Sequence, residues 1–292
     1  MRILGIGVAA LDVIQRVASY PPEDTEVRAL DQRLARGGNA ATTLVVLSQL
    51  GHACAWAGVL AHDPSSRIIL DDLQHWGVDT GLCRRVPGGA TPTSYITVSE
   101  ASGSRTIVHY RELPEFDAQD FADLDLGGLD WVHFEGRPNV DEMGTMLARL
   151  RHECPELRCS LEVEKPRTGI EGLIDSPNLL LFSRGYAESR GHSDPARFLE
   201  SVRPITRADW IVCAWGSDGA YAMDRGGRAT HSPAFAPPRL VETVGAGDVL
   251  NAGMIHSALL GKALPQALED ACRLAGRKCG RLGFAGLGDP RG

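Results

Sequence analysis

The stretch ETVGAGDVLNAGMIHSALLG, residues 242–261, places two glycines and an alanine directly before an aspartate and then becomes apolar at helical spacing. This spacing predicts a helix that begins near Gly247 and Asp248 and stops at Gly261. The first amides of a helix have no intrahelical partner and lie at the positive end of its dipole, so they favour an anion. The Gly-Ala-Gly segment has no bulky side chain, so a phosphoryl group can approach the backbone closely.

Asp248 has two interpretations at this position. An aspartate at a helix start is commonly an N-cap, which contributes roughly 1 kcal/mol to stability. The alternative is a general base that accepts a proton beside a transferred phosphoryl group. The pattern leaves both open, and the glycines favour the general base because an ordinary cap does not need Gly-Ala-Gly.

Outward from this stretch, short apolar runs typical of buried strands alternate with longer segments of helical period. The runs are RILGIGV (2–8), WVHFEG (131–136), CSLEVE (159–164), LLLFS (179–183) and WIVCAWG (210–216). Their alternation predicts a parallel sheet with crossover helices, in which ligands collect at the carboxyl ends of the strands. The polar residues that follow these runs are therefore candidate site residues: Asp12 and residues 135–137, 164–167 and 216–219.

One region departs from this alternation. TPTSYITVSEASGSRTIVHY (91–110) has period-two patterning around Ser102 and Gly103, which predicts a β-hairpin. YPPEDTEVRALDQRLARGG (20–38) contains a Pro-Pro pair that excludes a helix at its start. We expect the two segments to form a small sheet, a lid of residues 12–36 and 91–111 within a single domain spanning 1–292.

A second glycine-rich stretch, RGGNAATTLVVLSQLG (36–51), precedes another apolar helix. Asn39 either caps this helix or binds a ligand hydroxyl, and the cap is the simpler interpretation. GIGVAALD (5–12) fits the dinucleotide pattern G-x-G-x-x-A, but a lone match is weak evidence. No long helix follows it, which argues against a nicotinamide site, and the sequence contains no G-x-x-x-x-G-K-[ST] phosphate loop.

The composition limits the classes of partner that the protein is expected to bind. The net charge is −7 and the sequence pI about 5.7, which argues against a nucleic-acid surface and favours a small-molecule partner. The seven cysteines form no C-x-x-C pair, which is typical of reduced thiols in a cytoplasm. The sequence contains no uncharged apolar segment of about 18 residues, so no membrane partner is expected.

Taken together, the early Gly-Gly-Asn, the hairpin and the late Gly-Ala-Gly-Asp resemble the ribokinase-like carbohydrate kinases, also called the PfkB family. The similarity is greatest to the ketohexokinase branch. It is carried by ALDVIQRVASYPPEDTEVRALDQRLARGGNA, GSRTIVHY, WVHFEGR, EVEKPR, VCAW, PPRLVETVGAGD and AGRKCGRLGF. The resemblance implies a three-layer α/β/α sandwich with a β-sheet lid that also forms a homodimer. It further implies ATP-dependent phosphorylation of the 1-hydroxyl of a ketohexose such as D-fructose.

The resemblance also implies site residues. Asp248 would take the hydroxyl proton, and the amides of Gly245, Ala246 and Gly247 would form an anion hole. The residues expected to contact the sugar are Asp12, Asp24, Gly38, Asn39, Thr42 and Asp248. The residues expected to contact ATP are Arg105, Gly216, Ser217, Asp218, Gly219, Gly245, Gly247 and Cys279. Mg²⁺ is expected to arrive with ATP rather than at a dedicated protein site, and K⁺ is an additional candidate.

Two departures from the family pattern affect these expectations. Thr42 stands where ketohexokinases usually carry an asparagine, and Glu242 replaces the aspartate of D-T-x-G-A-G-D near which a monovalent cation binds. The acceptor therefore has alternatives within the family: ribose, a nucleoside or a sugar phosphate. An alternative of another class is a non-catalytic, sugar-binding regulatory protein.

Overall fold

The five apolar runs all form strands of one nine-stranded sheet. The computed structural model describes residues 1–288, so the last four residues of the expected domain lie outside the described residues. The strand order is β15 (Ala229–Ser232), β14 (Ala220–Asp224), β13 (Trp210–Ala214), β12 (Leu179–Ser183), β11 (Arg158–Val163), β10 (Trp131–Glu135), β1 (Arg2–Ile6), β4 (Ala53–Ala57) and β6 (Val78–Asp79). Neighbours from β13 to β6 are parallel, as predicted, and β14 and β15 are antiparallel additions at one edge.

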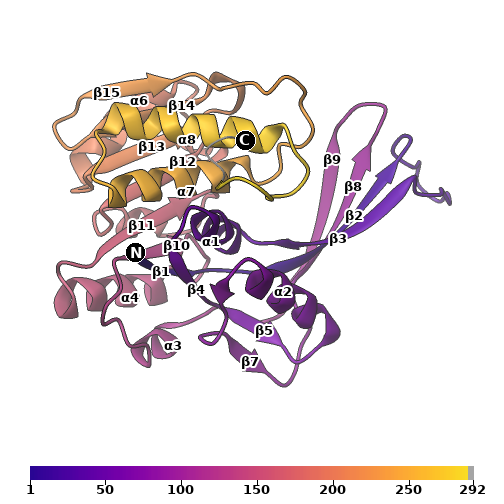
Figure 1. Ribbon diagram of the computed structural model, residues 1–292, viewed down its shortest axis with the longest axis horizontal. Coiled ribbons are helices and arrows are strands. Elements are labelled where there is room, and N and C mark those ends of the chain that lie inside the picture. The colour runs from indigo at the N-terminus through magenta and orange to yellow at the C-terminus, as the bar shows by residue number, and fades with distance from the viewer. Residues whose placement is uncertain (289–292) are drawn as a thin grey trace.

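Helices cover both faces of this sheet (Figure 1). One face packs against α1 (Asn39–Gln49), α2 (Pro64–His75), α7 (Ala246–Leu259) and α8 (Leu264–Cys279). The other packs against α3 (Ala118–Ala122), α4 (Val140–Glu153), α5 (Arg184–Ser189), α6 (Pro195–Val202) and the 3₁₀ turn η1 (Ile170–Leu173). The predicted three-layer α/β/α sandwich is confirmed. Among the helices of residues 1–288, none has the length and apolar character to cross a membrane.

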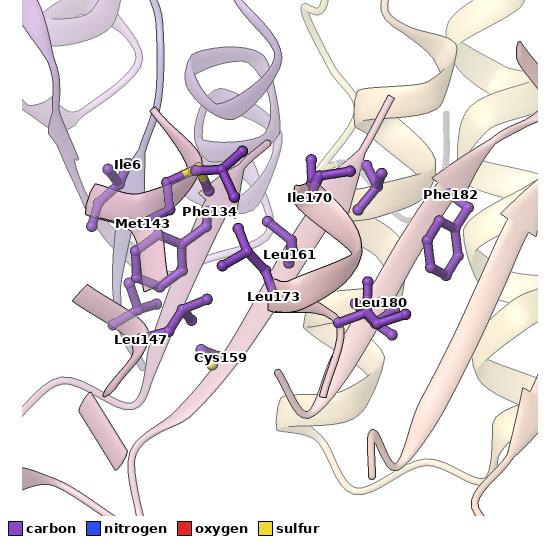
Figure 2. Packing of buried hydrophobic residues seen from close by; sticks show 14 of the residues in the cluster. Ile6, Phe134, Met143, Leu147, Cys159, Leu161, Ile170, Leu173, Leu180 and Phe182 are labelled. Carbon is purple, nitrogen blue, oxygen red and sulfur yellow. The ribbon is translucent and has the colours of Figure 1, made fainter. Parts of the chain in front are cut away.

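Alternate residues of each central strand belong to opposite cores because strand side chains alternate between faces. Trp131 packs on the side of α1 and α7, whereas Val132 packs on the side of α4. Figure 2 shows the second core, in which Phe134 and Leu161 from adjacent strands meet Met143 of α4. Strands buried on both faces appear in the sequence as nearly continuous apolar runs, which is why they were predictable.

A separate four-stranded sheet projects from the body (Figure 1), and we call it the lid sheet. Its order is β3 (Asp31–Gly37), β2 (Ala10–Val17), β8 (Thr93–Ser99) and β9 (Arg105–Tyr110). The predicted hairpin is β8 with β9, and β2 pairs antiparallel with β3 but parallel with β8. The parallel pair joins the two expected lid segments into one sheet. Two further short strands, β5 (Val59–Ala61) and β7 (Arg84–Val86), pair near its base.

Candidate active site

A cleft of about 720 Å³ lies where the carboxyl ends of the core strands face the lid sheet. The core contributes side chains at or just beyond strand ends: Val8, Glu135, Glu162 and Ser183. The start of α7 closes one side, and the inner face of the lid sheet contributes another. The site is thus at the strand edge where open α/β sheets bind ligands.

The structure does not support the interpretation of Asp248 as the N-cap of α7. Gly245 is the N-cap, in the left-handed conformation at φ 78°, and the helix begins at Ala246 rather than near Gly247. Asp248 is therefore the third helical residue, and it lines the cleft. Its backbone carbonyl accepts a 3.3 Å hydrogen bond from the hydroxyl of Thr43, which ties α7 to α1.

Gly245 and Gly247, at the start of this helix, are glycines for different physical reasons. A Cβ on Gly245 would meet the Phe284 ring at 2.6 Å, and its positive φ also disfavours other residues. A Cβ on Gly247 would meet nothing within 4 Å, so protein packing does not explain a glycine there. The backbone amide of Ala246 donates a 3.2 Å hydrogen bond to the carbonyl of Thr243. The amides of Gly247 and Asp248 remain as first-turn donors for an anion.

The structure also corrects the interpretation of Asn39 as the cap of the helix after Gly-Gly-Asn. Gly38, at φ 107°, is the N-cap of α1, and Asn39 is its first helical residue. A Cβ on Gly38 would lie 2.0 Å from the Val8 carbonyl oxygen, so only glycine fits. The side-chain amide of Asn39 donates a hydrogen bond to Glu164 Oε2 at 3.1 Å, within the cleft. The side chain of Asn39 is thus available for polar contacts rather than used to cap α1.

Asp12 projects from β2 into the cleft beside the Gly37 backbone. Burial raises the pKa of Asp12, and the hydrogen bond with Ser94 and the positive charge of Arg36 offset part of that rise. Ser94 in turn contacts His109 Nδ1 at 3.1 Å across the β8–β9 pair. These side chains form a polar row on the inner face of the lid sheet.

Thr42 lies below this row and is 3% exposed. Its hydroxyl accepts a 3.1 Å hydrogen bond from Arg36 Nη1, and Arg36 Nε donates to Asp72 Oδ2 at 2.6 Å. Thr42 and Arg36 both line the cleft. The residue that departs from the ketohexokinase pattern is therefore at the site and is connected to a buried cation.

Asp248 shares the cleft with several glutamates. Burial raises its pKa well above the ordinary value, the negative charges of Glu162, Glu164 and Glu135 add to that rise, and Arg36 opposes it. A carboxyl whose proton affinity is raised in this way is better matched to accept a proton near neutral pH.

Two arginines of the lid sheet reach the loop that leads to the start of α7. Arg33 of β3 forms an ion pair with Glu242, and Arg105 of β9 donates to the Thr243 hydroxyl at 3.5 Å. Glu242 also accepts hydrogen bonds from the wholly buried Lys278 Nζ at 3.0 Å and from the Gly283 amide at 3.1 Å. Glu242 thus joins the lid, this loop and the end of α8.

Burial alone raises the pKa of Glu242. The hydrogen bonds from Lys278 and the Gly283 amide, with the positive charges of Lys278 and Arg33, outweigh that effect and leave the pKa below its ordinary value. Glu242 is therefore ionised at neutral pH.

The structure brings most of the expected residues together. Those that line the cleft are Asp12, Gly38, Asn39, Thr42, Arg105, Gly245, Ala246, Gly247 and Asp248. Asp24 lies instead in an exposed turn with φ 58°, outside the cleft. Residues 216–219 and Cys279 do not line the cleft either. Residues 216–219 form the turn that follows β13 shortly after the cleft residue Ala214, and the backbone carbonyl of Cys279 accepts hydrogen bonds from the amides of Val241 and Glu242.

Several cleft residues escaped sequence reasoning. Glu162 was hidden inside an apolar strand pattern, and Asn251 lies three residues after Asp248 on α7. His109, whose alternating apolar context favours a packing role, is exposed on the inner face of the lid sheet. The signal that points to Glu162 is its type: a glutamate within a buried central strand requires a specific partner or a proton.

No group of three His, Cys, Asp or Glu side chains in residues 1–288 is arranged to hold a metal ion. The oxygens of Glu135 already accept from two amides and from Arg137. Both oxygens of Glu135 are therefore already bonded within the protein.

A family model described as pfkB family carbohydrate kinase matches residues 2–286. The chain belongs to the pfkB family. Ketohexokinase of Mus musculus is 38% identical over 294 residues, covering 98% of both chains. ATP-dependent ribose-1-phosphate kinase of Halopiger xanaduensis is 26% identical, covering 97% of this chain and 93% of that protein.

Solved structures agree in fold. Ribokinase from Arabidopsis thaliana, complexed with ribose and ATP, has a TM-score of 0.79 at 16% identity, covering 96% of this chain and 93% of that one. The predicted family and the ribokinase-like fold are both confirmed. As a pfkB carbohydrate kinase, the protein is an ATP-dependent enzyme.

Proposed function

We propose that this enzyme transfers the γ-phosphoryl group of ATP to the 1-hydroxyl of a ketohexose such as D-fructose. The observation that carries the proposal is one cleft that joins Asp248 and the open start of α7 to Asp12 and Asn39. The 38% identity with the mouse ketohexokinase over nearly the whole chain supports a ketose as acceptor.

In this mechanism Asp12 and Asn39 orient the acceptor, and Asp248 accepts the proton of the attacked hydroxyl. The first-turn amides of α7 stabilise the negative charge on the transferring group. Mg²⁺ bound to ATP supplies further charge neutralisation when the nucleotide is present. Arg105, residues 216–219 and the surroundings of Cys279 hold the nucleotide, beyond the acceptor end of the cleft.

The lid sheet has a second proposed role, as a homodimer interface. Its outer face carries a row of side chains that crosses all four strands in register: Leu34, Val13, Tyr95 and Val108. Leu34, Tyr95 and Val108 are each more than half exposed. An apolar row of this kind on a projecting sheet matches a second copy of the same surface. We place the enzyme in the cytoplasm, with K⁺ as a candidate activator.

Another acceptor within the family is the second candidate. Thr42 differs from the ketohexokinase pattern and sits in the cleft, bonded to Arg36. The ribose-1-phosphate kinase relative, at 26% identity, makes a sugar phosphate or a pentose the main competitor.

An acceptor screen tests the proposal. The purified enzyme with ATP and Mg²⁺ is assayed for ADP release on D-fructose, ribose, ribose 1-phosphate, fructose 1-phosphate and a nucleoside. We expect the highest kcat/KM on D-fructose, with the phosphate on O1 by NMR. A higher kcat/KM on another acceptor selects the second candidate. Absence of ADP release on the whole panel favours a regulatory, sugar-binding protein.

A further inference from the structure

Two glutamates lie side by side at the floor of the cleft. Glu135 on β10 and Glu162 on β11 are register partners in parallel strands, so their side chains point to the same face. Both residues are 6% exposed, and both line the cleft. Two negative charges at the roughly 5 Å spacing of adjacent strands would repel strongly in a buried site.

Glu135 has the partners that an ionised carboxylate needs. Its Oε2 accepts hydrogen bonds from the amides of Val8 at 3.1 Å and Ala40 at 3.3 Å. Its Oε1 accepts from Arg137 Nη1 at 2.9 Å, and Arg137 is held in turn by Glu115. A paired charge with three donors is stable when buried.

Glu162 has no such partners. Its Oε1 accepts a 3.0 Å hydrogen bond from the neutral amide of Asn251, and within residues 1–288 its Oε2 has no donor and no contact with solvent. No lysine or arginine of the described residues forms an ion pair with it. On its other side the register partner is Leu181.

The charged groups that face Glu162 are all negative, and the neutral amides there only partly offset their repulsion. These groups are the carboxylates of Glu135, Glu164 and Asp248 and the amides of Asn39 and Asn251. A buried carboxyl without a cation is stabilised by keeping its proton.

We propose that Glu162 works as a neutral carboxylic acid, a positioning residue that holds a proton beside Asp248 and influences phosphoryl transfer through it. This rests on the proposed function, in which Asp248 accepts the hydroxyl proton. After burial, ionised Glu162 makes the largest contribution to the raised pKa of Asp248, so a neutral Glu162 favours ionised Asp248 as the proton acceptor and leaves less negative charge facing the incoming phosphoryl group. Ionised Glu162 repels that group and competes with Asp248 for the transferred proton.

Burial and the charges around Glu162 set the pH at which this carboxyl loses its proton. Burial, followed by the negative charges of Glu135 and Glu164, raises the pKa of Glu162 to about 8. The carboxyl keeps its proton below that pH and loses it above. Since the ionised form is the inhibitory one, the activity of the enzyme is expected to decline on the alkaline side.

The test compares the pH dependence of the wild type and Glu162→Gln, whose amide mimics the protonated acid and keeps the bond from Asn251. From a pKa of about 8, kcat/KM of the wild type should fall about tenfold between pH 7 and pH 9. In Glu162→Gln the same ratio should stay within about twofold of unity. Glu269→Gln, on α8, is the control and should follow the wild type. An alkaline decline that persists in Glu162→Gln overturns the proposal.

A second measurement does not depend on activity. Infrared difference spectra of the free wild-type enzyme should show a protonated carboxylic acid band at pH 7 that titrates away above about pH 8. The component that titrates above about pH 8 should be missing from Glu162→Gln, and any band that remains there is assigned to Asp248, whose pKa is also raised. Lack of the band in the wild type contradicts the proposal even if the kinase assay succeeds. If the band is present but the enzyme phosphorylates no ketose, Glu162 is protonated as proposed, and only the proposed function is refuted.

Discussion

The core sheet and the lid sheet both supply polar groups to the cleft, but they hold them differently. In the core, Glu135 and Glu162 are 6% exposed and are fixed by buried hydrogen bonds. In the lid, every residue of β9 is exposed, and Arg105 reaches Thr243 at 3.5 Å. Buried, bonded groups keep one geometry, whereas exposed pairs contribute only about 0–1 kcal/mol. The difference predicts that substitutions in the core change the chemical step and that substitutions in the lid sheet change closure of the cleft.

The largest expected effect is at the core. Asp248→Asn removes the proton acceptor, so kcat should fall by about 100-fold or more, because general-base catalysis typically contributes about 10² to 10⁴. Binding of ATP, measured by calorimetry, should stay nearly unchanged. Asp270→Asn on α8, which removes a carboxylate bonded to Lys262 outside the cleft, is the control. A kcat for Asp248→Asn within a few-fold of the wild type would remove the proposed role of this carboxylate.

The next effect is at the junction between the two sheets. Arg33→Gln breaks the ion pair with Glu242 but leaves Lys278 paired with it. The side chain of Arg33 is about one third exposed, so we expect a loss of about 1 kcal/mol, or roughly fivefold in the KM of the acceptor, with a smaller change in kcat.

Arg16→Gln is the matched control because its pair with Glu100 is exposed on the same lid sheet, away from the cleft. It should change the KM by less than about twofold. Equal effects of the two variants would mean that Arg33 acts only through the stability of the lid sheet.

The smallest expected effect on turnover is on the outer face of the lid sheet. Val108→Glu places a charge in the exposed apolar row, so it should convert the dimer to a monomer in light scattering after size exclusion. The inner face is unaffected, so we expect kcat within about threefold of the wild type. Leu260→Glu, exposed at the end of α7, is the control. A wild-type monomer, or a Val108→Glu dimer, excludes this face as the interface.

Prediction from sequence succeeded where local pattern and buried environment agree. The central strands were recognisable because burial on both faces requires continuous apolar residues, as in LLLFS at β12. The helix after Gly-Ala-Gly was predicted with a start one residue late, because the left-handed Gly245 is the cap. Asp248 and Asn39 were both assigned possible cap roles, and both are helical residues after glycine caps.

Sequence alone determined the strand and helix alternation, the glycine-rich helix starts and, through their order, the carbohydrate kinase family. Only the tertiary structure decided which charged groups meet. Glu135 and Glu162 become neighbours through strand register, and Arg33 meets Glu242 across 209 positions of the chain. The physical reason is that the state of a buried carboxyl depends on the donors and charges around it. Those neighbours come from distant segments that local sequence patterns do not specify.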